Sequence, residues 1–244
     1  MASYHDVGVA LRTVRLGEAD RIVTFITREH GKIRAVAKGV RKTKSHIGAR
    51  VEPLSHATLL CWRGRELDVV TQVEVIDHFR AIREDLDRLS QAMTMLEIID
   101  QVTLEHNPAP ELYALLVGAL RALDEGGSPL VLGAFCWKLL FLEGVAPIID
   151  SCARCGSKEP LVAFDASEGG FLCRSHRKGQ AVSEDVVELV RRILSGGLAR
   201  ALKEPTSPAA AAVEDLGTSA VEHHIDRRLR SMRHKERSEV RSAL

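Results

Sequence analysis

Alternating apolar and polar positions predict strands in the first third of the chain. Five runs rich in β-branched and apolar residues are separated by turns, and two of these turns contain a glycine that suits a hairpin. The runs lie at residues 7–16, 21–28, 31–38, 56–62 and 66–76. Five short strands in succession are typical of a small closed barrel, and the OB-fold is the commonest five-stranded candidate.

The period of the apolar positions becomes helical at about residue 79, where they recur every three or four residues. Proline, glycine and capping residues mark the ends of the predicted helices. The first predicted helix carries an apolar stripe of Ile82, Leu86, Leu89, Met93, Leu96 and Ile99. Further helices are predicted at residues 111–124, 129–144, 184–196 and within 209–233. We therefore expect a multidomain β + α protein, with an N-terminal OB-fold β-barrel over residues 1–78 and an α-helical domain over residues 79–244.

The composition is that of a folded globular protein, because 45% of the residues are hydrophobic and 27% are charged. No stretch approaches the ~18 apolar residues of a membrane span. The first residues also lack the basic and then apolar order of a secretory signal. We expect a cytoplasmic protein without a membrane partner.

The charge is distributed unevenly, although the whole chain carries only +1. Residues 1–80 contain fourteen Lys and Arg against nine Asp and Glu, a net charge of +5, whereas residues 81–244 carry −4. This asymmetry indicates that the front half of the chain binds a polyanion.

A run of basic residues lies between Glu29 and Glu52 with no acidic residue among them. On the predicted third strand, the basic positions share one face and the apolar positions share the other, and the run then continues in a long loop. We predict that the run binds the phosphate backbone of a nucleic acid. A solvated charge run is the alternative, which mutual repulsion disfavours. The run consists of Lys32, Arg34, Lys38, Arg41, Lys42, Lys44 and Arg50.

Aromatic residues are scarce, at 4% of the chain. Tyr4, Phe25 and Trp62 can stack on bases, but the pattern favours a core position for each of them. We therefore expect backbone electrostatics rather than base readout to dominate nucleic-acid binding.

Two pairs of ligand-type residues are separated by seventeen residues. The pairs are Cys152-x-x-Cys155 and Cys173-x-x-His176, and each places two metal-binding side chains on a tight turn. The gap can hold a small hairpin that brings the pairs together around a tetrahedral ion. We predict a structural Zn2+ knuckle, inserted in the helical domain at about residues 150–178. Free thiols and a catalytic zinc are the alternatives, but four protein ligands leave a catalytic ion no open position.

The other candidate residues favour ordinary structural roles. Cys61 and Cys136 lie in apolar patterns typical of buried thiols, and the neighbours His223 and His224 cannot face the same way on a helix. The sequence contains no phosphate-binding loop, no dinucleotide fingerprint, no nucleophile elbow and no paired-carboxylate signature. We therefore predict that the protein is not an enzyme. A zinc-dependent hydrolase, the catalytic alternative, would need an acid in a cleft.

Several segments resemble the bacterial recombination mediator family RecO, and together they extend over nearly the whole chain. The stretch from residue 31 to residue 41 is the most specific of them. The segments are Gly8 to Arg15, Glu18-Ala19-Asp20, Gly31-Lys32-Ile33, Ala37-Lys38-Gly39-Val40-Arg41 and Leu229-Arg230-Ser231.

The resemblance implies an N-terminal OB-fold, a helical C-terminal domain and, in many members, a zinc knuckle inserted among the helices. It also implies a DNA repair protein of the nucleoid that binds single- and double-stranded DNA and anneals complementary strands. Members of the family contact the acidic C-terminal tail of single-strand-binding protein and work with RecR to load RecA. Zinc-bearing members usually have four cysteines, from which His176 departs. The same charge pattern would serve a zinc-ribbon plus OB-fold protein that binds RNA or a transcription complex, and this is the alternative.

Overall fold

The chain forms two compact units. The computed structural model describes residues 2–40, 47–203 and 207–231. The first unit runs to Glu125 and includes the segment that begins at Arg230, and the second is Gly126–Leu229. The predicted domain boundary at residue 78 lies where the strands end and the helices begin. The first compact unit also contains the first three helices, so this boundary stays a prediction. None of the described helices is long and apolar enough to cross a membrane.

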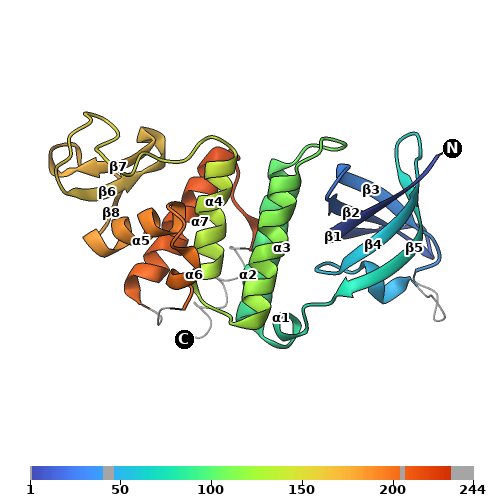
Figure 1. Cartoon of the computed structure of the whole chain (residues 1–244). Coiled ribbons are helices and arrows are strands. Elements are labelled where there is room, and N and C mark those ends of the chain that lie inside the picture. Colours follow the sequence, from blue (N-terminus) through green and yellow to red (C-terminus); the bar gives the residue numbers. More distant parts are fainter. Residues whose placement is uncertain (1, 41–46, 204–206, 232–244) are drawn as a thin grey trace. The chain divides into compact units, whose positions relative to one another are not determined.

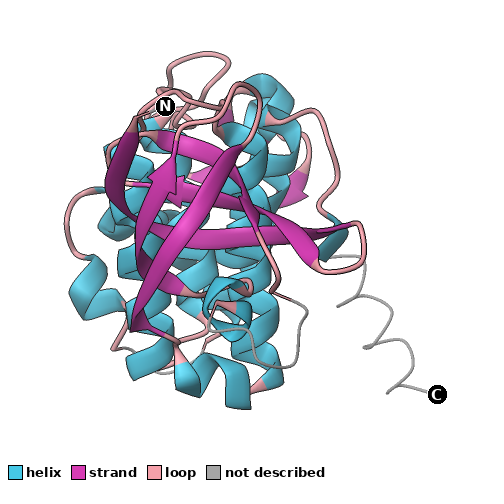
Figure 2. Ribbon diagram, turned by 90° about the vertical axis from the view of Figure 1, so that its right-hand side faces the viewer, coloured by secondary structure: helices cyan, strands magenta, loops and turns pink. Residues whose placement is uncertain are grey.

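Five strands at the start of the chain form a closed barrel with the strand order of the predicted OB-fold (Figure 1). They are β1 (Ser3–Leu16), β2 (Asp20–Thr27), β3 (Gly31–Ala37), β4 (His56–Trp62) and β5 (Asp68–Asp77), and the 3-10 helix η1 (Gly48–Val51) precedes β4. β1 pairs with both β2 and β4, and a bulge between Ala10 and Arg12 interrupts its pairing with β2. The barrel closes where β3 runs parallel to β5. Figure 2 shows the strands crossing one another, as closure requires.

The barrel core follows from the alternation of residues along each strand. On β3, Ile33 and Ala35 are fully buried, whereas Lys32 and Arg34 belong to the face that points away from the barrel core. Phe25 is also fully buried, so its predicted core position is confirmed. The other strands complete the core with Ala10, Val23, Ala57, Leu59, Cys61, Val70 and Val73.

Three helices follow the barrel in the first unit: α1 (Arg80–Glu84), α2 (Leu86–Val102) and α3 (Pro110–Glu125). The prediction of one continuous helix from residue 79 is wrong at Asp85, which has an extended backbone and accepts a hydrogen bond from the Arg88 N–H as the cap of α2. This break changes the phase of the apolar stripe, so Leu86 is 81% exposed and Met93 is 36% exposed. The buried apolar side of α2 consists of Ala92, Met95, Leu96, Ile98 and Ile99.

The helices of the first unit lie against the barrel, with α2 contacting β1 and α3 contacting β2. The segment between the two helices covers the start of β3, because the His106 N–H donates to the Lys32 carbonyl at 2.8 Å. Gly31 permits this approach: its φ is +68°, and a Cβ there would lie 1.9 Å from the Asn107 carbonyl oxygen. One side of the barrel is therefore covered by helices and their connection.

The second unit is built around α4 (Leu130–Leu142), which is buried over most of its length. α7 (Pro208–His224) packs along α4 (Figure 1). Gly133 permits this close packing, because a Cβ there would lie 3.0 Å from the backbone of Glu214. α5 (Glu184–Leu194) packs on both helices, and α6 (Leu198–Ala201) packs on α5.

The end of α7 differs from the prediction. The sequence predicts a last helix with apolar positions as far as Leu229, but α7 ends at His224. Leu229 lies in the segment after α7 and is buried. His223 and His224 are exposed, as predicted. The apolar position at Leu229 is therefore buried although it lies beyond the helix.

A three-stranded sheet is inserted between α4 and α5. Its strands are β6 (Leu161–Asp165), β7 (Gly170–Cys173) and β8 (Gln180–Ala181), with β6 in the middle, and the 3-10 helices η2 (Ala166–Glu168) and η3 (Arg174–His176) follow β6 and β7. Phe164 and Phe171 lie with their ring centroids 5.6 and 6.0 Å from that of Trp137 on α4. These aromatic contacts anchor the sheet to the core of the second unit.

Candidate metal centre and nucleic-acid interface

Four ligand-type side chains converge beside the inserted sheet. Cys152 and Cys155 lie on the loop before β6, Cys173 is the last residue of β7, and His176 is the last residue of η3. The donor atoms of these four side chains all lie within 4.8 Å of one another. The convergence predicted from their spacing is confirmed. We call residues 150–178 the metal knuckle.

The distances in the cluster suit a tetrahedral zinc ion. Zinc bonds of about 2.3 Å to sulfur and about 2.0 Å to nitrogen place two sulfurs about 3.8 Å apart, and a sulfur and a nitrogen about 3.5 Å apart. Cys155 Sγ and Cys173 Sγ are 3.9 Å apart, and Cys173 Sγ lies 3.5 Å from His176 Nδ1. Cys152 Sγ lies 4.0 Å from the same nitrogen. Three sulfurs and one imidazole nitrogen therefore fit a tetrahedral zinc ion.

The backbone around the cluster favours thiolates. The Cys173 N–H, with smaller contributions from the N–H groups of Cys155 and Arg154, lowers the pKa of Cys152 to about 6 against the effect of desolvation. A thiolate is the form that binds a metal. The Ser157 N–H also lowers the pKa of Cys155, but desolvation and the two neighbouring thiols outweigh it and raise that pKa. The backbone therefore favours the thiolate most strongly at Cys152.

The two cysteines outside the cluster are buried, as predicted. Burial is the largest cause that raises the pKa of Cys61 and of Cys136, each to about 12. Such protonated thiols behave as small apolar side chains. Among the described residues, His/Cys/Asp/Glu side chains form only one group of three or more that could hold a metal, and it is the one in the knuckle.

The basic residues of the barrel fall into two sets. We call those that lie within 4.0 Å of a carboxylate the paired cations. Lys32 is the most constrained of them: its side chain is 12% exposed, and its Nζ donates to the Asp100 carbonyl at 2.6 Å and lies 3.4 Å from Asp100 Oδ1. Arg34 lies 3.7 Å from Glu105. The paired cations are Arg12, Arg21, Arg28, Lys32 and Arg34.

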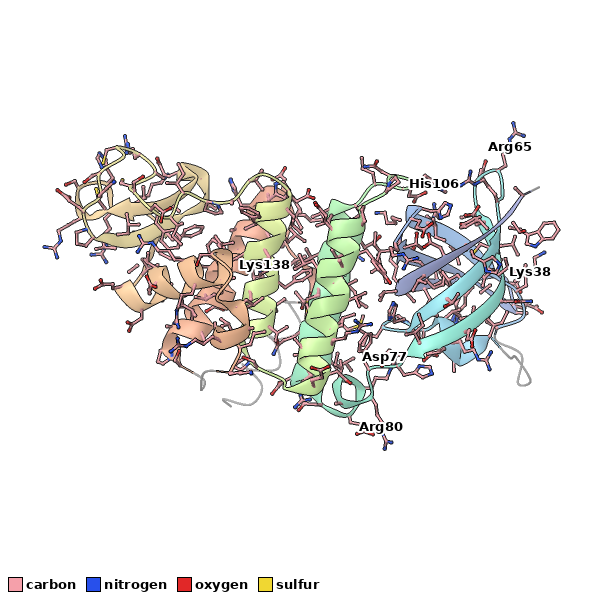
Figure 3. The ribbon with its side chains drawn as sticks, viewed as in Figure 1. Lys38, Arg65, Asp77, Arg80, His106 and Lys138 are labelled. Carbon is pink, nitrogen blue, oxygen red and sulfur yellow. The ribbon has the colours of Figure 1, made fainter. Side chains whose placement is uncertain are left out.

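The second set, which we call the open cations, has no carboxylate within that distance in the described part of the chain. Lys38 and Arg50 belong to it from the predicted basic run, and Arg50 Nη1 donates to the Val73 carbonyl at 3.2 Å. Figure 3 shows Lys38 and Arg65 on the side of the barrel that faces away from α3. The open cations are Arg15, Lys38, Arg50, Arg63 and Arg65, all of them exposed.

The predicted basic run is therefore divided. Lys32 and Arg34 are paired with acids of the segment from α2 to α3, Lys38 and Arg50 are open, and Arg41, Lys42 and Lys44 lie outside the described residues. The binding of DNA by the run stays a prediction. Arg63 and Arg65 lie outside the predicted run, in Trp62-Arg63-Gly64-Arg65, one of the two glycine-containing turns that the sequence predicts as hairpins. Two arginines in one exposed turn were the available signal.

The preference for a core position is wrong for Trp62, whose side chain is 47% exposed. Trp62 is the last residue of β4, and its cross-strand partners are Ser3 and Val69. Cys61, one residue earlier, points into the core. Because successive side chains of a strand point to opposite faces, the buried cysteine places the indole on the outer face.

A buried carboxylate organises the end of the barrel near Trp62. Asp6 Oδ2 lies 2.7 Å from His30 Nδ1, and the Asp6 carboxylate also accepts hydrogen bonds from the N–H groups of Val7, Glu29 and His30. Burial alone raises the pKa of Asp6, but these hydrogen bonds, led by that of His30, lower it below its ordinary value. The ring of His30 packs against Tyr4, with 4.3 Å between their centroids. The turn between β2 and β3 is therefore fixed to β1.

Two family models match the chain. The model described as recombination protein O N terminal matches residues 1–79, which hold the barrel. The model described as recombination protein O C terminal matches residues 83–233, which hold α2 to α7 and the metal knuckle. Together the two matches cover nearly the whole chain, and only residues 80–82 of α1 lie between them.

Proposed function

The chain belongs to the RecO family of recombination proteins, whose role is that of a mediator in DNA repair and recombination, and on this premise we propose how it acts. It binds single- and double-stranded DNA through the barrel and anneals complementary strands. With RecR, it helps to load RecA onto DNA coated by single-strand-binding protein. It works in the cytoplasm on nucleoid DNA and carries out no catalytic step.

The observation that carries this proposal is the separation of paired from open cations on the barrel. A cation held by a carboxylate is already neutralised, whereas an open cation gains by meeting a phosphate and releasing its counterions. Lys38, Arg63 and Arg65 are open, and Arg41, Lys42 and Lys44 lie within six residues after Lys38 in the sequence. We therefore propose that the DNA backbone runs along this basic stretch and that Lys32 contributes least to the binding free energy.

Annealing follows from the same charges. Two complementary strands repel one another through their phosphates, and a basic surface that contacts both of them reduces this repulsion. Base pairing then drives the reaction, so no nucleotide is hydrolysed. We expect the protein to accelerate annealing of complementary oligonucleotides at low salt and to lose this effect as salt rises.

A competition experiment tests the nucleic-acid class. Single-stranded DNA and RNA of the same length and sequence compete for the protein at one fixed salt concentration. Preferential binding of DNA supports the proposal, whereas a clear preference for RNA favours an RNA-binding protein. RecA filament formation on DNA coated by single-strand-binding protein, with and without RecR, tests the mediator step separately.

We propose that the metal knuckle binds one Zn2+ with a structural role. Cys152, Cys155, Cys173 and His176 would hold it, and the ion would supply the cross-link that a small sheet lacks. Four protein ligands complete the tetrahedron and leave no position for a reacting water. Metal analysis of the purified protein tests this, with about one zinc per chain expected.

We propose that the acidic tail of single-strand-binding protein docks on the second unit. Large exposed apolar side chains are concentrated there in the eight residues from the end of α4 onward, and Phe141 is 60% exposed. Lys138 lies one turn earlier on α4 and can meet a carboxylate (Figure 3). The exposed residues are Phe141, Leu142, Val145 and Ile148.

Binding of a labelled tail peptide tests this docking. Phe141→Asp should weaken binding of the peptide by about tenfold or more. The substitution replaces an apolar side chain that the bound peptide would cover with a charge that repels the acidic peptide. Leu104→Asp is the matched control, since Leu104 is 69% exposed in the first unit. Equal loss in both variants would count against the second unit as the docking site.

A further inference from the structure

Trp62 lies at the edge of an exposed basic turn. The turn between β4 and β5 carries Arg63 and Arg65, both exposed and both open cations, and Glu66 is its only acid. A single exposed apolar side chain is ordinary on a protein surface. An indole 47% exposed beside two open cations suits a nucleotide, because the indole can stack on the base and the arginines can contact phosphates.

Arg63, Tyr4 and His30 lie one against another at this end of the barrel. The guanidinium of Arg63 lies 5.6 Å from the ring centroid of Tyr4, and the Tyr4 ring lies against His30 on its neighbouring turn. Tyr4 is the cross-strand partner of Cys61 and packs against the barrel core, so its ring lies on the inner face and holds the turn from that side. Trp62, one residue after Cys61, supplies the exposed aromatic face on the outer side of the same turn.

The turn is held in place before any ligand binds. Asp68 is buried, accepts the Gly64 N–H at 2.9 Å through Oδ1, and accepts the Tyr4 hydroxyl through Oδ2. The Arg63 N–H donates to the Ala2 carbonyl at 3.0 Å. A fixed turn loses little conformational entropy on binding, so its side chains are effective contacts.

We propose that Trp62 stacks on an unpaired base of single-stranded DNA while Arg63 and Arg65 contact the phosphates on either side of it. The inference rests on the proposed DNA binding and adds a preference to it. In a duplex the faces of the bases are already stacked, so Trp62 favours single strands over duplex. The contact is tolerant of sequence, because every base has a π-face.

Fluorescence tests the contact in the intact protein. The chain contains two tryptophans, and Trp137 is 1% exposed, so a change on binding an oligothymidine reports Trp62. We expect the oligothymidine to quench the fluorescence of the wild type and to protect it from iodide. The change should vanish in Trp62→Phe, which keeps Trp137.

Affinity tests the preference. Trp62→Ala should weaken binding of single strands by about tenfold and leave the slope of log affinity against log salt unchanged, because the lost contact is uncharged. Trp62→Phe should retain most of the affinity, and duplex binding should change by less than about twofold. Ile76→Ala, at a position of β5 that is 50% exposed, is the matched control.

The outcomes separate this inference from its premise. If the wild type binds single strands without a change in fluorescence and Trp62→Ala binds them equally well, the stacking contact is refuted and DNA binding stands. If Trp62→Ala loses as much affinity for duplex as for single strands, the preference is refuted. If the wild type binds no DNA even at low salt, both the proposed function and this inference fail.

Discussion

The metal knuckle and the barrel both carry a functional set that is close together in the sequence, but they present it differently. In the knuckle, the four donor atoms gather within 4.8 Å of one another. On the barrel, Lys32 is held by Asp100, whereas Lys38, six residues later, is open. One set converges and the other is divided between a covered and an exposed surface.

The difference shows which properties are local. Ligand-type residues with two residues between them share one turn, so their convergence needs only a hairpin between the two pairs. The availability of a charge depends on what packs against it, and Asp100 reaches Lys32 from a helix 68 residues away in the sequence. A basic run therefore overstates the surface that a polyanion meets.

The largest effect should come from removing a metal ligand. Cys152→Ser should abolish stoichiometric zinc binding and speed hydrogen exchange across the knuckle by more than about 100-fold, because the cross-link supplies its folding energy. DNA binding by the barrel should change by less than about twofold. Hydrogen exchange with mass spectrometry measures the first effect and DNA titration the second. Cys136→Ala, at a buried thiol outside the cluster, should keep its zinc.

Removing three cations of the basic run should have the next largest effect. Replacement of Arg41, Lys42 and Lys44 with Ala should reduce the slope of log affinity against log salt from roughly −3.5 to roughly −1.5 for single strands. Binding should weaken for all sequences alike, and annealing should fall in parallel. An unchanged slope, with the fold intact by circular dichroism, would move the site to the arginines between Arg227 and Arg233.

A pair of single substitutions sharpens the contrast between paired and open cations. Lys32→Ala should lower the free energy of unfolding by about 1–3 kcal/mol, because it removes a largely buried donor from Asp100, and should leave the salt slope unchanged. Lys38→Ala should leave stability within about 0.5 kcal/mol and reduce the slope by about 0.7. Urea denaturation and salt titration measure the two quantities. The reverse pattern would show that pairing does not decide which cations bind DNA.

The smallest effect concerns the barrel's contact with its own helices. His56 at the start of β4 is 3% exposed, and its Nε2 lies 2.8 Å from the Tyr113 hydroxyl of α3. Burial, followed by repulsion from Arg121, lowers the pKa of His56 below its ordinary value of 6.5, although Asp77 opposes this. The unfolded chain therefore binds the proton more readily, and stability should be lost as the pH falls through 6.5 toward the folded-state pKa.

Denaturation of the wild type and of His56→Gln between about pH 7 and 5 checks this effect. The variant should lose less stability over the interval, because it has no imidazole to protonate. His5→Gln, at an exposed position of β1, is the matched control and should behave as the wild type. The same pH dependence in His56→Gln as in the wild type would assign the effect to another group.

The sequence by itself located most of the elements of this protein and the cluster of ligand-type side chains. Alternation located the barrel strands to within a few residues, because the period of a strand is a property of consecutive positions. The spacing of Cys152, Cys155, Cys173 and His176 identified the cluster, because ligands on tight turns are arranged locally. Gly126 and Gly127 likewise marked the end of α3, which stops at Glu125.

Tertiary structure decided which side chains are available. Trp62 follows an apolar run, yet it faces outward because the buried Cys61 fixes the phase of β4. Leu86 fits the helical period, yet it is exposed because Asp85 breaks the helix. Lys32 belongs to the basic run, yet Asp100 neutralises it. Each outcome depends on the phase of an element or on a neighbour distant in the sequence. Neither can be predicted from periodicity and composition alone.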